Sequence, residues 1–175
     1  APVNTDDIVI DRNATITIDG VYSPSSLWIV NNAVVNFTNT SGSIRVYTVS
    51  GTALFPAFKI ESGSTFNIIG NTTIRLAIAA GSTASIFGVL DISGSSSSMD
   101  NSFGNGVTTI KTGGKIRYGG NSSNGTGSVS TLILESGSTY EIYKNGGIFP
   151  TGTYHPNSLL LNTGSTLDRA SFSMN

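Results

Sequence analysis

The chain has 175 residues and a net charge of −1, from nine basic and ten acidic residues. Only 11% of the residues are charged, against about 25% in an average domain, so no basic footprint for DNA, RNA or anionic lipid is expected. Cysteine is absent, which excludes disulfide scaffolds, thiolate zinc sites and cysteine nucleophiles. The length predicts a single domain over residues 1–175 with a substantial core.

The opening stretch, APVNTDDIVI, has neither the basic segment nor the apolar core of a secretion signal. No apolar run is long enough to span a membrane, so no membrane span is expected. The low charge and the abundance of Ser, Thr, Asn and Gly favour an extracellular location. If the protein is exported, this sequence is its mature form.

Seven similar units recur along the chain, each with an aliphatic run, a turn of small residues and a second alternating run. In chain order they cover residues 8–20, 27–37, 58–70, 74–88, 108–120, 132–143 and 159–168. Seven units in 175 residues average one per 25 residues. Self-similarity at such a period is typical of repeat proteins, whose stacked units share one core.

Apolar residues alternate within each unit, as at Phe58, Ile60, Phe66 and Ile68. A period of two predicts strands with one buried face, and the enrichment in Val, Ile, Thr and Phe favours strands as well. Helix is expected to be nearly absent.

A residue that tolerates positive φ stands at the turn of every unit. These residues are Asn13, Asn32, Gly63, Gly81, Gly113, Gly137 and Gly164. We interpret the recurring "GST" as one equivalent corner of successive coils, where Gly supplies the bend and Ser and Thr hydrogen-bond along the stack. The longer insertions between units are expected to emerge on one side of the stack, which in solenoids is often the binding side.

The pattern predicts an all-β solenoid, specifically a right-handed parallel β-helix of about seven irregular coils. A β-sandwich of short alternating strands is the alternative, but recurrence of the same turn in the same phase favours the solenoid. The residues predicted to point inward are Ile10, Ile18, Ile60, Ile68, Leu76, Ile86, Ile116, Leu134, Ile142 and Leu161.

Two stretches, "TDDIVIDRNATITIDG" and "SGSTYEIYKNGGIFPTGTYHPNSLLLNTGS", carry a family resemblance. They resemble large secreted β-helix repeat proteins of Bacteroidetes, although Tyr154 stands where that pattern commonly has Trp. The resemblance implies export, attachment to or release from the cell surface, and a parallel β-helix. It implies no catalytic residue.

The sequence lacks the residues that the common types of catalytic site require. The single histidine, His155, lies in the turn-like stretch TYHPN, and no metalloprotease, phosphate-loop or dinucleotide motif is present. Glycan-cleaving β-helices place acidic or basic residues on neighbouring coils, and the candidates here are Asp91, Asp100, Glu135, Glu141 and Asp168, with Lys59, Arg75, Lys111 and Arg117 as partners. Their spacing does not converge, so the sequence predicts no enzyme, no catalytic residue and no cofactor.

Four acidic residues gather near the N-terminus, at Asp6, Asp7, Asp11 and Asp19. Carboxylates bind Ca²⁺, but the spacing of a calcium loop is missing, so we interpret them as a polar cap and predict no metal site.

Aromatic residues with polar groups are the candidates for stacking on sugars, namely Trp28, Tyr47, Tyr118, Tyr143 and Tyr154. Trp28 is the best of them because it lies in the outward phase between Leu27 and Ile29.

The sequence therefore favours a non-catalytic extracellular structural or adhesive module. This module is expected to be a rigid solenoid that presents loops or self-associates through its ends into filaments. The C-terminal edge is expected to be completed by further coils of a longer parent or by another subunit. The alternative is a β-helix that binds or cleaves carbohydrate, with glycans as partners.

Overall fold

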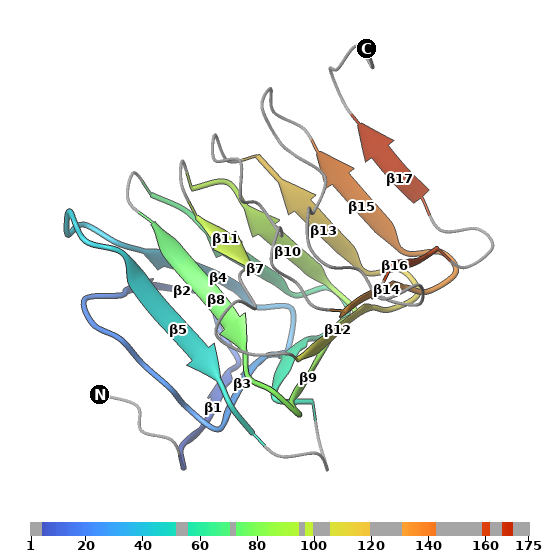
Figure 1. Cartoon of the computed structure of the whole chain (residues 1–175). Coiled ribbons are helices and arrows are strands. Elements are labelled where there is room, and N and C mark those ends of the chain that lie inside the picture. Colours follow the sequence, from blue (N-terminus) through green and yellow to red (C-terminus); the bar gives the residue numbers. More distant parts are fainter. Residues whose placement is uncertain are drawn as a thin grey trace.

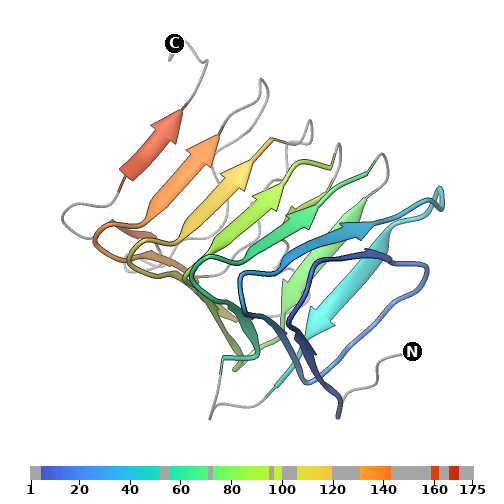
Figure 2. The same ribbon diagram turned by 180° about the vertical axis from the view of Figure 1, so that it is seen from behind.

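The computed structural model describes residues 5–51, 56–70, 73–94, 97–99, 106–119, 131–142, 159–161 and 166–169. These residues form seventeen strands and no helix, as the period of two predicts. The strands lie in three sheets, and within each sheet they follow one another along the molecule in chain order (Figures 1 and 2).

Two of the sheets have seven strands and the third has three. The first sheet contains, in spatial order, β1 (Asp7–Ile10), β3 (Ser26–Ile29), β6 (Phe58–Ile60), β9 (Thr83–Ile86), β12 (Val107–Ile110), β14 (Thr131–Leu134) and β16 (Leu159–Leu161). The second contains β2 (Ala14–Thr17), β4 (Val34–Thr38), β7 (Thr65–Ile68), β10 (Val89–Ile92), β13 (Lys115–Tyr118), β15 (Thr139–Ile142) and β17 (Thr166–Arg169). The third contains β5 (Arg45–Val49), β8 (Ile74–Ile78) and β11 (Ser98–Met99).

Each passage of the chain through the sheets is a coil, named here by its strands. Equivalent strands of successive coils pair in parallel, so that Ile60 of β6, for example, lies opposite Ile86 of β9. All pairings among the described strands are parallel, whereas a β-sandwich is built from antiparallel sheets. The arrangement is therefore that of a solenoid-like β-helix.

In-register pairing places like residues above one another and so builds the core. One inward column of the first sheet consists of Ile10, Ile29, Ile60, Ile86, Ile110 and Leu134. Most of the residues predicted to point inward are buried, namely Ile18, Ile60, Ile68, Leu76, Ile86, Ile116 and Leu134. Ile10 is partly buried against this core, and the side chains of Ile142 and Leu161 lie outside the described residues.

Glycine turns join the first sheet to the second at the corners where the sequence predicts them. Between β6 and β7 the Ser64 N–H donates to the Glu61 carbonyl at 3.0 Å, and Gly63 has a φ of 81°. A positive φ at the third position is the mark of a type II turn, which favours Gly there. Gly113 and Gly137 have φ values of 80° and 77° at the same corner of later coils.

Asparagine replaces glycine at the corner between β3 and β4. Asn31 and Asn32 have φ values of 59° and 57°, as in a type I′ turn, which confirms the prediction for Asn32. Asn13 was expected to behave likewise, but it is not among the positive-φ residues of the described chain. Its Oδ1 instead accepts a hydrogen bond from the Val34 N–H at 2.8 Å. Gly164 lies outside the described residues.

The prediction of one equivalent corner is wrong for Gly81. The unit that starts at Ile74 begins in the third sheet, so Gly81 turns the chain from β8 of the third sheet into β9 of the first. In that coil the corner between the first and second sheets is residues 87–89, between Ile86 and Leu90. Strands of the third sheet alternate as the others do, so the sequence pattern did not separate the two kinds of corner.

Candidate functional site on the outer face of the second sheet

Polar side chains follow one another along the outer face of the second sheet. The six aligned residues, which we name the outer ladder, are Thr15, Asn36, Asn67, Asp91, Arg117 and Glu141. Alternation places them outward, since Leu90 and Ile92 on either side of Asp91 are completely buried. Parallel pairing without a register shift separates successive members by about 4.8 Å, within reach of hydrogen bonds between side chains.

The first half of the outer ladder is joined by uncharged hydrogen bonds. The Asn67 amide Nδ2 donates to Asn36 Oδ1 at 2.8 Å, and Asn36 Nδ2 donates to Thr15 Oγ1 at 3.2 Å. These bonds run from coil to coil, so the side chains reinforce the backbone pairing of β2, β4 and β7.

The second half of the outer ladder is charged, and it brings together residues that the sequence analysis did not predict to be neighbours. Arg117 Nη1 donates to Asp91 Oδ2 at 2.9 Å, and Arg117 Nε donates to Glu141 Oε2 at 2.9 Å. Lys115 Nζ lies 3.5 Å from Glu141 Oε2. The Asp91 and Glu141 side chains are only 13% and 15% exposed. The expectation that these acidic residues do not converge is therefore wrong for Asp91 and Glu141, which flank one guanidinium.

A local signal could have revealed this convergence. Asp91, Arg117 and Glu141 are each the single charged residue between two aliphatic or aromatic residues of a strand, as in LDI, IRY and YEI. Unequal corner lengths hide the alignment of these three residues in the sequence. The corner at residues 87–89, for example, is two residues shorter than the corner at residues 61–65.

The electrostatics of the outer ladder do not suit acid catalysis. Arg117 donates a hydrogen bond to the Glu141 carboxylate, and this bond, together with the nearby Lys115 ammonium, holds the pKa of Glu141 below its ordinary value of 4.5. A carboxyl that acts as general acid near neutral pH needs a raised pKa instead. Glu141 is an ionised carboxylate already engaged with two cations, Arg117 and Lys115, which both belong to the preceding coil.

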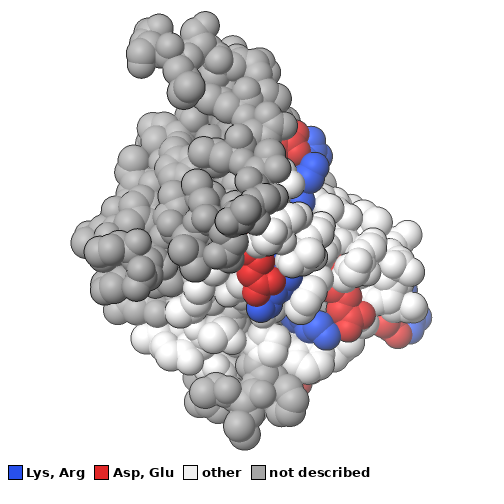
Figure 3. All heavy atoms as spheres, turned by 90° about the vertical axis from the view of Figure 1, so that its right-hand side faces the viewer, with Lys and Arg blue, Asp and Glu red and all other residues white. Residues whose placement is uncertain are grey.

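A second set of ion pairs lies at the corner between the first and second sheets. Lys59 Nζ lies 2.8 Å from Glu61 Oε1, and Lys111 Nζ lies 2.7 Å from Glu135 Oε1. These hydrogen bonds from lysine lower the pKa of Glu61 and of Glu135. On the face turned toward the viewer in Figure 3, acidic and basic side chains lie in adjacent pairs separated by uncharged surface. Opposite charges are thus neutralised locally, and no field of one sign extends over the described part of this face.

Trp28 occupies the outward position that its sequence context predicts. It is partly exposed between the buried Leu27 and Ile29. Its indole Nε1 donates to the Pro56 carbonyl at 2.8 Å, and Lys59 Nζ lies 5.2 Å from the ring centroid in a cation–π contact. The ring is thereby held in one orientation on the outer face of the first sheet.

The other predicted aromatic residues do not form a described site with Trp28. Tyr47 is only 3% exposed and belongs to the core, which corrects its assignment as a surface residue. The backbone of Tyr118 lies in β13 in register with Ile92, and its side chain is outside the described part. Tyr143 and Tyr154 lie outside the described residues altogether.

The remaining charged candidates lie in β17, in β8 or outside the described residues. Asp168 of β17 is in register with Glu141, Arg75 lies in β8 of the third sheet, and Asp100 and His155 are outside the described residues.

The acidic residues of the first coil are engaged separately. Asp7 Oδ1 accepts from Ser26 Oγ at 2.7 Å, Asp11 pairs with Arg12 at 3.1 Å, and Asp19 accepts from the Tyr22 hydroxyl. Within the described chain no three His, Cys, Asp or Glu side chains are grouped to hold a metal ion.

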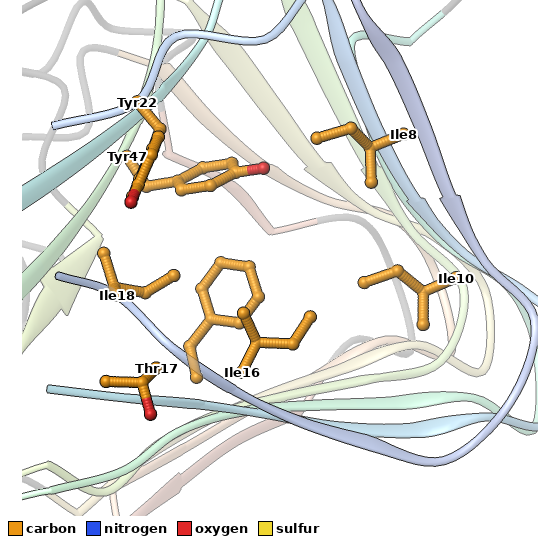
Figure 4. A pocket seen from close by; sticks show the side chains of 8 residues that line it. Ile8, Ile10, Ile16, Thr17, Ile18, Tyr22 and Tyr47 are labelled. Atoms are coloured by element: carbon orange, nitrogen blue, oxygen red, sulfur yellow. The ribbon is translucent and has the colours of Figure 1, made fainter. Parts of the chain in front are cut away.

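An apolar cavity of about 230 Å³ opens at the β1–β2 end of the stack. Figure 4 shows the isoleucines and tyrosines that surround it pointing toward one another. Its lining comprises Ile8, Ile10, Ile16, Thr17, Ile18, Tyr22, Phe37 and Tyr47.

No family model matches this chain, and no significant match is found among curated proteins or solved structures. The described part of the chain contains no helix long and apolar enough to cross a membrane.

The charged half of the outer ladder predicts a pH-dependent stability. The lowered pKa of Glu141 means that its ion pairs contribute fully above pH 4.5 and are lost as the pH falls through the lowered value. We expect Glu141→Gln to cost about 1–3 kcal/mol at pH 7 and to weaken the acid dependence of unfolding. Urea unfolding from pH 7 to pH 3 measures both effects.

The matched control for Glu141→Gln is Asp11→Asn, since the Asp11 side chain is 56% exposed in its pair with Arg12. Exposed pairs contribute little, so this change is expected to cost less than about 0.5 kcal/mol. Equal losses in the two variants at pH 7 would show that the outer ladder is not a stabilising contact.

Proposed function

We propose that the chain is a non-catalytic extracellular module with a structural or adhesive role. In this proposal it is a right-handed parallel β-helix of about seven irregular coils that serves as a rigid support, presents loops and self-associates. Location outside the cell, free or attached to the surface, follows from the resemblance to secreted repeat proteins and from the low content of charged residues.

One observation carries the proposal: the polar groups on the outer face of the second sheet bond to neighbouring coils. Asp91 and Glu141 are two carboxylates of the outer ladder, and Arg117 lies between them and binds both. A hydrolase needs one carboxyl free to give a proton and another free to activate water or attack the sugar. Side chains committed to inter-coil bonds favour mechanical support over turnover.

Two measurements on the purified chain test this proposal. Small-angle scattering is expected to give an elongated, stiff particle, and a panel of polysaccharides is expected to release no reducing ends. Release of reducing ends that disappears in Glu141→Gln, while that variant remains folded, would overturn the non-catalytic role.

Carbohydrate binding is a second candidate, favoured by the fixed ring of Trp28. A preorganised aromatic ring loses little entropy when a sugar stacks on it, and Lys59 beside it offers a donor to a sugar hydroxyl or carboxylate. A glycan array with Trp28→Ala tests this candidate. Binding that is lost in Trp28→Ala and kept in Ser85→Ala, in the same outward column, would support it; unchanged binding would exclude Trp28.

A further inference from the structure

The outer face of the first sheet carries two aromatic side chains, Trp28 and Phe87. Trp28 lies in β3 and is partly exposed, and Phe87, which directly follows β9, is 37% exposed. Both occupy outward positions, since their neighbours Leu27, Ile29 and Ile86 are completely buried. Each ring therefore presents apolar surface at the outside of the stack, on which a sugar ring can stack.

Strand pairing fixes the separation of these two side chains. Trp28 lies opposite Lys59 of β6. The Phe87 N–H donates to the Ile60 carbonyl at 2.8 Å, which continues the parallel pairing of β6 with β9 and places Phe87 beside Glu61. Trp28 and Phe87 are therefore two coils apart along the stack and one outward position apart along the strands, which corresponds to about 12 Å between their Cα atoms.

An ion pair lies between the two aromatic residues. Lys59 Nζ is 2.8 Å from Glu61 Oε1, and these two side chains are 25% and 39% exposed. Lys59 is the residue opposite Trp28, and Glu61 is the residue beside Phe87. An ammonium group and a carboxylate at this distance offer a donor and an acceptor side by side, which adjacent hydroxyl groups of one sugar can bridge.

The charges between the two rings favour an uncharged ligand. Lys59 and Glu61 neutralise each other, so a polymer of acidic sugars would gain no net attraction and would meet the Glu61 carboxylate. A neutral sugar can accept from the ammonium and donate to the carboxylate, because each hydroxyl group is both a donor and an acceptor. The ion pair therefore selects hydroxyl-rich, neutral sugars over acidic ones.

The spacing of the coils favours an extended chain of sugars. The path from Trp28 to Phe87 crosses one coil, so each of its two steps is about 6 Å, comparable to the length of one sugar in an extended β-1,4-linked glycan. The first and third rings of such a glycan present the same face. Three consecutive sugars thus place one ring at Trp28, hydroxyl groups at the ion pair and another ring at Phe87, whereas a disaccharide reaches only one aromatic ring.

We propose that Trp28, Lys59, Glu61 and Phe87 form one binding surface for an extended, uncharged β-1,4-linked polysaccharide, with a sugar stacked on each aromatic ring. The proposal rests on the carbohydrate-binding candidate given above and deepens it, since it adds a second ring and names the class of sugar. Two stacking contacts on one chain act together, so the affinity is expected to rise steeply once the ligand reaches both rings.

Calorimetric titration of the 175-residue chain tests this surface. The probes are β-1,4-linked hexasaccharides of glucose, mannose, xylose and N-acetylglucosamine, together with their disaccharides. At least one hexasaccharide is expected to bind the parent, and Trp28→Ala and Phe87→Ala are each expected to lower that affinity about tenfold. The corresponding disaccharide is expected to bind about tenfold more weakly than the hexasaccharide and to be unaffected by one of the two substitutions.

Val34→Ala is the matched control, because Val34 is 40% exposed but lies in β4 of the second sheet. This variant is expected to bind the hexasaccharide as the parent does. Circular dichroism and the melting temperature establish that each variant remains folded.

Three results would overturn the proposal in different ways. Unchanged affinity in Phe87→Ala would remove the two-ring surface and leave a single stacking ring at Trp28. Equal affinity for maltohexaose, which is α-1,4-linked, or for hexagalacturonate, which is acidic, would contradict the class of ligand. Absence of binding to every hexasaccharide at millimolar concentration would remove carbohydrate binding altogether, while the structural role would still be decided by small-angle scattering.

Discussion

Gly88→Ala is expected to be among the most damaging single substitutions in the chain. A Cβ at this position would lie 2.2 Å from the Ser64 carbonyl oxygen and 2.3 Å from the Glu61 carbonyl oxygen, both backbone atoms of the preceding coil. The Gly88 N–H also donates to the Ile60 carbonyl at 3.1 Å, so the two coils cannot separate without losing a hydrogen bond. We expect a loss of about 3 kcal/mol or more in the free energy of unfolding.

Urea unfolding followed by circular dichroism measures this loss. Gly42→Ala is the matched control, because a Cβ at Gly42 meets no atom within 4 Å. That change is expected to stay within about 0.5 kcal/mol of the parent. Equal stability of Gly88→Ala and Gly42→Ala would contradict the close approach of the corner at residues 87–89 to the preceding coil.

Ile60→Ala is expected to cost about 2–5 kcal/mol, the range for truncating a buried aliphatic side chain. Ile60 is completely buried, and its column places Ile29 on one side and Ile86 on the other. Neighbouring coils hold these partners by backbone pairing, so the core cannot collapse freely into the space left behind. Equilibrium unfolding in urea at pH 7 gives the value.

The same substitution at an exposed isoleucine provides the comparison. Ile44 is 51% exposed, and Ile44→Ala is expected to change the free energy of unfolding by less than about 0.5 kcal/mol. Similar losses at both positions would contradict the assignment of the inward column.

Much of this fold follows from two local rules. Alternation identified strands such as β6 and β7 and placed Ile60 and Ile68 inward, because one face of each strand has to be buried. Residues that tolerate positive φ located the corners at Gly63 and Asn32, since their turns require that conformation.

Relations between coils were harder to predict. Strands of the third sheet show the same alternation as the others. The predicted unit over residues 74–88 therefore combined β8 of the third sheet with β9 of the first. The cluster of Asp91, Arg117 and Glu141 depends on register, which the unequal corner lengths obscure. Burial and turn conformation are properties of a few neighbouring residues, whereas register is a property of the whole stack.

Stacked parallel coils also determine how this molecule would respond to a pulling force. β1 and β17 lie at opposite ends of the stack (Figure 1), so tension along the axis loads the inter-coil bonds one layer after another. The layers would detach singly from an end, and each would release the chain between equivalent residues, such as the 24 residues from Phe66 to Leu90. At about 3.4 Å per extended residue, one detached layer adds roughly 80 Å of length. A molecule built from such layers would therefore lengthen in steps when it is pulled along its axis.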